Sequence, residues 1–198
     1  MRGGDGMLTF VSGGVRSGKS SFAERLLVDG ARKTGGRLVY VASGRAVDEE
    51  MQERIERHKA DRAGESWLTI EQPMSLHEVL PFIREGDFVL WDCLTTWLAN
   101  EMYEEIGHTY CVHVENCMRD KTERLMETVA AITAKASQFV IVSNEVLDEL
   151  PSVYEETKMY CGWIGMLHQQ LVAFADTAIE MDTGMALYWK QDGQVVMR

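Results

Sequence analysis

The sequence is short of positive charge. Its 198 residues include 20 Lys and Arg against 31 Asp and Glu, which gives a formal net charge of −11 at pH 7. Nucleic acids and anionic membrane surfaces both attract proteins through basic patches, so this imbalance argues against either as the main partner. It does not exclude a nucleotide, because a nucleotide needs only local positive charge.

Long hydrophobic runs are also missing. No stretch is long enough to cross a bilayer, and residues 1–6 are not followed by the hydrophobic segment of a signal peptide. We therefore expect a cytoplasmic protein with no membrane insertion. The length, with 45% apolar and 26% charged residues, fits one domain at 7–198 behind a flexible lead-in at 1–6.

Cysteines are few and lack the paired Cys-x-x-Cys spacing of structural metal sites. The four are scattered along the chain as Cys93, Cys111, Cys117 and Cys161. In a chain with no export signal, we expect them to be free thiols. Cys111 and His113 with Cys117 resemble a set of metal ligands, but their spacing argues against a metal site.

What the sequence does have is a complete phosphate-binding loop. The segment has the pattern Gly-x-x-x-x-Gly-Lys-Ser and runs through Gly13, Gly14, Val15, Arg16, Ser17, Gly18, Lys19 and Ser20. It follows the apolar, β-branched run Leu8–Val11 and precedes a helical pattern, which is the context that this motif requires. A chance glycine turn before a helix is the alternative, but the agreement of strand, loop and helix argues against it.

Each part of the loop has a chemical role. The glycines let backbone N–H groups approach phosphate oxygens, and the helix N-terminus adds partial positive charge. Lys19 is expected to reach the outer phosphates and Ser20 to ligate Mg²⁺, while Arg16 adds a further cation. The protein is therefore predicted to bind a nucleoside triphosphate with Mg²⁺.

The rest of the chain predicts an α/β fold with a mostly parallel central sheet and helices on both faces. Short runs that are apolar on both faces alternate with helical patterns, as in parallel sheets. The strands are expected at Leu8–Val11, Leu38–Ala42, Leu68–Glu71, Phe88–Trp91 and Phe139–Val142, with a closing edge pair at Ile179–Met181 and Ala186–Trp189. The helices are expected at Ser20–Arg32, Asp48–Arg62, Ser75–Arg84, Leu94–Ile106, Val114–Lys135 and Glu155–Ala175.

Polar residues end two of the predicted strands. Asp92 follows an apolar strand, where it is expected to support Mg²⁺, although it could also cap the next helix. Asn144 and Glu145 end the fourth strand and are expected to face the same site. Turn formation before Pro151 explains them equally well.

His58 has two interpretations. Met51, Ile55, His58 and Arg62 share one face of the predicted helix, so His58 can be a half-buried histidine that completes an apolar stripe. Alternatively, a neutral imidazole can attack phosphorus and form a covalent phosphoramidate. The neighbouring cations Arg54, Lys59 and Arg62 could stabilise the phosphate charge.

A family resemblance favours the second interpretation. The phosphate loop, the run Asp48-Glu49-Glu50-Met51 through Arg54-Ile55-Glu56-Arg57-His58-Lys59, and Asp92-Cys93-Leu94-Thr95-Thr96-Trp97 strongly resemble adenosylcobinamide kinase / adenosylcobinamide-phosphate guanylyltransferase. Val142-Ser143-Asn144-Glu145-Val146 also resembles that family. The likeness covers nearly the whole chain from Met7 and is strongest up to Val146. Beyond that point the chain departs from the family, for example at His168-Gln169.

The resemblance implies a cobalamin-biosynthesis enzyme with two activities. One phosphorylates adenosylcobinamide with ATP or GTP, and the other passes GMP from GTP to adenosylcobinamide phosphate through a guanylyl-histidine. The position that matches the guanylylated histidine is His58, and Glu71 and Asp92 match acidic positions near the nucleotide. The family forms homotrimers, so the resemblance also implies a homo-oligomer.

Two other functions agree with the residues. One is a small-molecule kinase that uses the phosphate loop without a covalent intermediate, so it would not need His58. The other is a nucleotide-responsive binding or assembly protein with little turnover. A GTPase switch is disfavoured because the sequence has no Asn-Lys-x-Asp for guanine.

Overall fold

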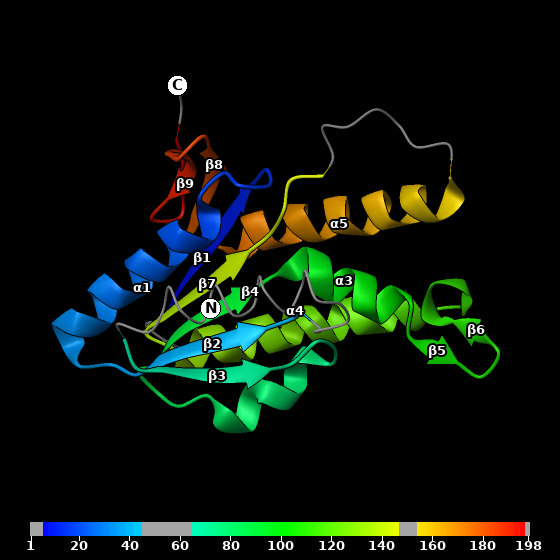
Figure 1. Cartoon of the computed structure of the whole chain (residues 1–198), viewed down its shortest axis with the longest axis horizontal. Helices are drawn as coiled ribbons and strands as arrows, with labels where there is room; N and C mark the ends of the chain where they lie inside the picture. Colours follow the sequence, from blue (N-terminus) through cyan, green and yellow to red (C-terminus); the bar gives the residue numbers. More distant parts are fainter. Residues whose placement is uncertain (1–5, 45–64, 147–153, 197–198) are drawn as a thin grey trace.

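A computed structural model describes residues 6–44, 65–146 and 154–196 of the chain. An eight-stranded sheet runs through it in the order β10-β9-β8-β1-β7-β4-β2-β3 (Figure 1). The strands are β1 (Met7–Gly13), β2 (Leu38–Ala42), β3 (Trp67–Glu71), β4 (Phe88–Asp92), β7 (Gln138–Val142), β8 (Thr177–Asp182), β9 (Met185–Gln191) and β10 (Gln194–Val195). All pairings from β8 to β3 are parallel, and β9 and β10 add an antiparallel edge, which confirms the predicted α/β fold and the closing edge pair.

Helices cover both faces of this sheet. Helix α1 (Lys19–Thr34) packs on one face through Ala23 and Leu27. The opposite face is covered by α3 (Leu94–Met102), α4 (Cys117–Lys135), α5 (Glu155–Phe174) and the 3-10 helix η1 (Leu76–Phe82). No helix in the described ranges is long and apolar enough to span a membrane.

The strands are apolar on both faces because both faces are covered. In β4, Phe88 and Leu90 join the cluster around α1, while Val89 and Trp91 join the cluster around α3, α4 and α5. The same alternation repeats in β2 and β7. Continuous apolar runs are what a parallel sheet between two helical layers requires, so the runs in the sequence predicted these strands closely.

Several predicted helices have different limits. The helix expected at Leu94–Ile106 ends at Met102, and the chain then forms a small hairpin of β5 (Glu105–Ile106) and β6 (Thr109–Tyr110) that turns at Gly107, with φ 66°. The expected Ser75–Arg84 helix is the 3-10 helix η1, with Pro81 inside it. The helix expected from Val114 begins at Cys117, because Cys111–His113 form a separate 3-10 turn.

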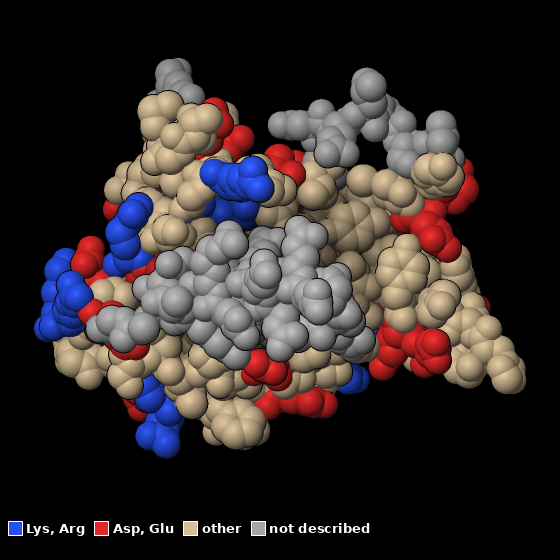
Figure 2. All heavy atoms as spheres, viewed as in Figure 1, with Lys and Arg blue, Asp and Glu red and all other residues tan. Residues whose placement is uncertain are grey.

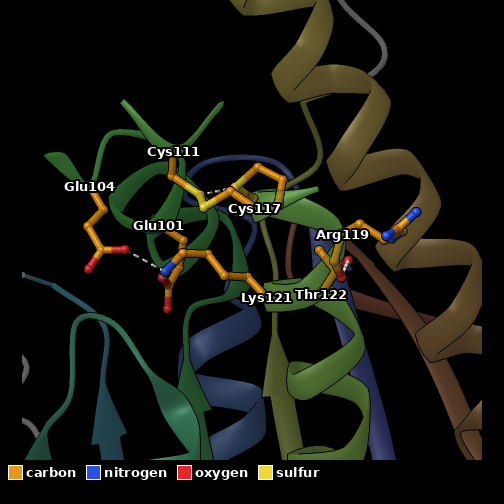
Figure 3. Close-up of a disulfide and its surroundings, with 8 residues drawn as sticks. Glu101, Glu104, Cys111, Cys117, Arg119, Lys121 and Thr122 are labelled. Carbon is orange, nitrogen blue, oxygen red and sulfur yellow. Dashed lines mark hydrogen bonds and ion pairs between the residues drawn. A yellow bond between two sulfur atoms is a disulfide. The ribbon is translucent and has the colours of Figure 1, made fainter. Parts of the chain in front are cut away.

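The expectation of four free thiols is wrong for two of them. Cys111 and Cys117 form a disulfide, whereas Cys93 and Cys161 are free. Figure 3 shows this disulfide beside the ion pairs that Lys121 makes with Glu101 and Glu104. The 3-10 turn brings the two sulfur atoms together, and the spacing of the cysteines alone does not predict that turn.

Candidate functional site

The phosphate loop joins β1 to α1, as predicted. The chain leaves the strand at Gly13, with φ 154°, and passes through Arg16 and Gly18, whose φ values are 62° and 88°. A Ser17 N–H···O=C Gly14 hydrogen bond of 3.2 Å closes the turn. A Cβ on Gly13 would lie 2.4 Å from the carbonyl oxygen of Met181. This position therefore requires glycine both for its φ and for the close approach of β8.

The side chains of the loop differ sharply in exposure. Lys19 is buried, and its Nζ donates a 2.9 Å hydrogen bond to the carbonyl oxygen of Gly14, which folds the cation back over the loop. The Ser17 hydroxyl is also buried, and it has no hydrogen-bond partner among the described residues. Val15 and Arg16 are exposed at the tip of the loop. The loop thus combines backbone N–H groups with two cations at the N-terminus of α1.

Ser20 and Asp92 meet at the end of the loop. Ser20 Oγ donates a 3.1 Å hydrogen bond to Asp92 Oδ2, which brings together the two predicted Mg²⁺ ligands. Tyr40 donates to the same carboxylate oxygen at 3.5 Å. Hydroxyl and carboxylate oxygens are the donors that Mg²⁺ prefers, and Mg²⁺ is usually held by one or two such groups together with substrate phosphates. The pair therefore fits a nucleotide-bound Mg²⁺.

Glu71 lies in the same row of the sheet as Asp92. In the β2–β3 and β2–β4 ladders, Ala42 pairs with Glu71 on one side and with Asp92 on the other. The two predicted acidic positions therefore lie at the carboxyl edge of the sheet, two strands apart. Within the part of the chain that is described, no group of three His, Cys, Asp or Glu side chains forms a metal site.

Asn144 and Glu145 lie at the same edge but differ in their contacts. The Asn144 amide donates to Thr95 Oγ1 at 2.8 Å, which ties the end of β7 to the start of α3. The Glu145 N–H donates to the carbonyl oxygen of Gly13 at 2.9 Å. Asn144 thus has a structural role in supporting the edge, whereas Glu145 directly contacts the first residue of the phosphate loop through its backbone.

Two features of the site were not found from the sequence. Ser143 Oγ lies 2.7 Å from His168 Nε2, and this contact joins β7 to α5. Burial lowers the pKa of His168, while the negative charge of Glu145 raises it. In addition, the Gly184 N–H in the β8–β9 turn donates to the carbonyl oxygen of Ser17 at 3.1 Å. No local pattern marks His168. The closing edge pair was predicted, but the contact of its turn with the phosphate loop was not.

The thiol of Cys93 is not a nucleophile in this arrangement. It is buried next to Asp92 and contacts the hydroxyls of Thr95 and Thr96 at 3.1 Å. Burial and the neighbouring carboxylate raise the pKa of the thiol above its usual range. Because the thiolate is the reactive form, this residue remains an inert part of the edge.

Charge is unevenly distributed over the surface. In Figure 2, Lys and Arg atoms gather over the end of α1, whose last turn holds Arg32 and Lys33, and Asp and Glu atoms gather toward the β5–β6 hairpin. The excess of acidic residues is therefore compatible with local positive charge around α1.

His58 and the cations predicted to flank it belong to the predicted helix Asp48–Arg62. All of these residues lie outside the part of the chain that the structure describes.

Comparisons with known proteins show the family of the chain. The family described as "Cobinamide kinase / cobinamide phosphate guanyltransferase" matches residues 9–188. The chain is 33% identical over 166 residues to the bifunctional adenosylcobalamin biosynthesis protein CobP of Pseudomonas aeruginosa, covering 83% of this chain and 87% of that protein. It is 29% identical over 173 residues to the bifunctional adenosylcobalamin biosynthesis protein CobU of Escherichia coli, covering 86% and 92%.

A solved structure shares the fold. The KaiC-like protein PH0186 of Pyrococcus horikoshii superposes with a TM-score of 0.50 over 97% of this chain and 82% of that one. The two sequences are 13% identical, so this likeness concerns the fold alone.

Proposed function

The chain belongs to the cobinamide kinase / cobinamide phosphate guanyltransferase family, and we propose that one nucleotide site at the carboxyl edge of the sheet serves both reactions. The protein is a kinase and guanylyltransferase of cobalamin biosynthesis. The observation that carries the single-site proposal is the hydrogen bond from Ser20 to Asp92. It joins the phosphate loop to a predicted acidic position that lies far from it in sequence.

The loop binds the triphosphate in this proposal. Its backbone N–H groups surround the inner phosphates, and Lys19 and Arg16 stabilise charge on the outer ones. Ser20 and Asp92 hold Mg²⁺, and Glu71 lies at the same edge near the nucleotide. When bound, Mg²⁺ neutralises phosphate charge and makes the departing phosphate a better leaving group.

The kinase reaction transfers the terminal phosphoryl group of ATP or GTP. The hydroxyl oxygen of cobinamide forms a bond to the γ-phosphorus, the bond between that phosphorus and the β,γ-bridging oxygen breaks, and the hydroxyl proton is released. Nucleoside diphosphate leaves with the bond's electron pair. The chain contributes positioning and electrostatic stabilisation, which supply most of the rate enhancement in phosphoryl transfer.

The guanylyl reaction uses His58 as a covalent carrier. A ring nitrogen of His58 forms a bond to the α-phosphorus of GTP, the bond to the leaving oxygen breaks, and pyrophosphate departs while the imidazole loses its proton. A phosphate oxygen of cobinamide phosphate then forms a bond to the same phosphorus, the phosphorus–nitrogen bond breaks, and the departing imidazole takes a proton back, which restores neutral His58. We further propose a cytoplasmic homotrimer, on the family resemblance alone.

Intact mass spectrometry tests the covalent step. The parent protein, His58→Asn and the control His108→Asn are incubated with Mg²⁺ and GTP; His108 is an exposed histidine in the β5–β6 turn. We expect an acid-labile, GMP-sized gain in the parent and the control, but not in His58→Asn. GTP binding with no gain in the parent would overturn the guanylyl-histidine and favour a kinase without a covalent intermediate, or a binding protein.

A further inference from the structure

Helix α5 contacts the end of β7 through one buried polar pair. Ser143 Oγ lies 2.7 Å from His168 Nε2, and Ser143 is completely buried, at 0% exposed. The His168 ring also packs edge-on against Phe10 of β1, with the ring centroids 5.2 Å apart. The imidazole therefore contacts both β7 and β1, the strand that leads into the phosphate loop.

The residues that follow β7 are hydrogen-bonded to this same strand. Ser143 N–H donates to the carbonyl oxygen of Val11 at 2.9 Å, and Glu145 N–H donates to that of Gly13 at 2.9 Å. Gly13 is the first residue of the phosphate loop. The position of the segment 143–145 therefore fixes the place at which the loop begins.

The contact between Ser143 and His168 can be made without a buried charge. Burial lowers the pKa of His168, although the negative charge of Glu145 raises it, so the ring is neutral near pH 7. A neutral imidazole has one donor and one acceptor nitrogen, and a hydroxyl can act as either partner. Loss of one partner would leave the other without its hydrogen bond inside the protein, which costs free energy. The contact therefore holds Ser143 firmly in place.

A second polar connection joins α5 to the same segment. The Tyr160 hydroxyl donates to the carbonyl oxygen of Thr95 at 3.2 Å, and the Asn144 amide donates to Thr95 Oγ1 at 2.8 Å. This connection passes through α3, whereas His168 reaches the segment directly. Helix α5 thus supports the end of β7 at two neighbouring residues.

We propose that His168 is a positioning residue for nucleotide binding. Through Ser143, it holds the segment 143–145 against β1, and this segment fixes Gly13 and the loop that binds the phosphates. His168 itself does not touch the nucleotide. The inference rests on the proposed use of the phosphate loop and adds to it a residue from a helix far along the chain.

The affinity for GDP, measured by isothermal titration, tests the inference without any reaction taking place. The variants are Ser143→Ala, His168→Leu, the double variant, and His168→Asn, which can still hydrogen-bond Ser143. Leu171→Ala is the control. Leu171 is fully buried in α5, so its truncation weakens the packing of the same helix without removing a polar contact. Urea denaturation measures the loss of stability in each variant.

We expect His168→Leu and Ser143→Ala each to bind GDP roughly tenfold more weakly than the parent, as for the loss of one hydrogen bond. The double variant should bind no more weakly than either single variant, because both changes remove the same contact. His168→Asn should bind like the parent. Leu171→Ala should also bind like the parent, although it is less stable.

Three results would overturn the inference and leave the proposed function intact. These are parent-like affinity in His168→Leu or Ser143→Ala, a loss in Leu171→Ala as large as in His168→Leu, and losses that add in the double variant. If His168→Leu did not fold, Ser143→Ala and His168→Asn would decide in its place: parent-like affinity in Ser143→Ala, or a tenfold loss in His168→Asn, would overturn the inference. If the parent did not bind GDP, the inference and the proposed function would both fail.

Discussion

Ser20 Oγ and Asp92 Oδ2 lie 3.1 Å apart, although 72 residues separate them in the chain. Ser20 is in the first turn of α1, and Asp92 ends β4, which pairs with β7 next to β1. The contact brings together the two oxygen donors that a magnesium–nucleotide complex would use. Both donors lie at the carboxyl ends of parallel strands, where ligands bind in such sheets.

Removing the Asp92 carboxylate should slow both reactions. Asp92→Asn keeps the size of the side chain but takes away the negative charge that would hold Mg²⁺, so kcat should fall roughly 100-fold, as for loss of one transition-state contact. Steady-state kinetics at several Mg²⁺ concentrations check this. Asp120→Asn, at an exposed position in α4, serves as the control. A parent-like kcat in Asp92→Asn would exclude a role in metal binding.

Gly13 should tolerate no side chain. A φ of 154° is unfavourable for alanine. In addition, an alanine Cβ would lie 2.4 Å from the carbonyl oxygen of Met181, which is a steric clash. Gly13→Ala should therefore lower the free energy of unfolding by about 3 kcal/mol. Gly14→Ala is the matched control, because a Cβ there meets nothing within 4 Å. Urea denaturation compares the two variants. Equal midpoints would show that β8 moves away readily.

Reduction of the disulfide should weaken the start of α4. Cys111 and Cys117 are six residues apart, and closing so short a loop contributes about 2 kcal/mol to the free energy of unfolding. Urea denaturation with and without a dithiol reductant measures the loss. Cys117→Ser should show no further effect of the reductant. Thiol titration of the denatured, unreduced protein should find only Cys93 and Cys161; four reactive thiols would contradict the pairing.

His168 should make stability depend on pH. Burial lowers its pKa in the folded protein, so the unfolded chain binds more protons at acid pH, and stability falls as the pH drops below the unfolded value of about 6.5. The loss continues down to the lower folded pKa, with a slope of at most about 1.4 kcal/mol per pH unit. The variant His168→Asn can still hydrogen-bond Ser143. Urea unfolding at about pH 8 and pH 5 should show that its free energy of unfolding changes less with pH than that of the parent. Parallel slopes would contradict the prediction.

The sequence predicted the strands better than the limits of the helices. Phe88–Trp91 is apolar throughout because helices cover both faces of β4. Burial on both faces requires such a continuous apolar run, and the run can be recognised in the local sequence. The end of α3 at Met102 was not visible. Tyr103, the C-cap residue of α3, donates through its hydroxyl to Glu156 Oε2 at 3.2 Å, and Glu156 lies 53 residues away in the sequence.

By itself, the sequence determined the phosphate loop, the α/β class and the family. These depend on residue type and close spacing: glycines that permit positive φ, Lys19 and Ser20 at the helix start, and alternating apolar runs. Only the tertiary structure decided which distant groups meet. It brought Asp92 to Ser20, Gly184 to Ser17 and Cys111 to Cys117, because strand order and packing set such contacts, and neither is written in any short stretch of chain.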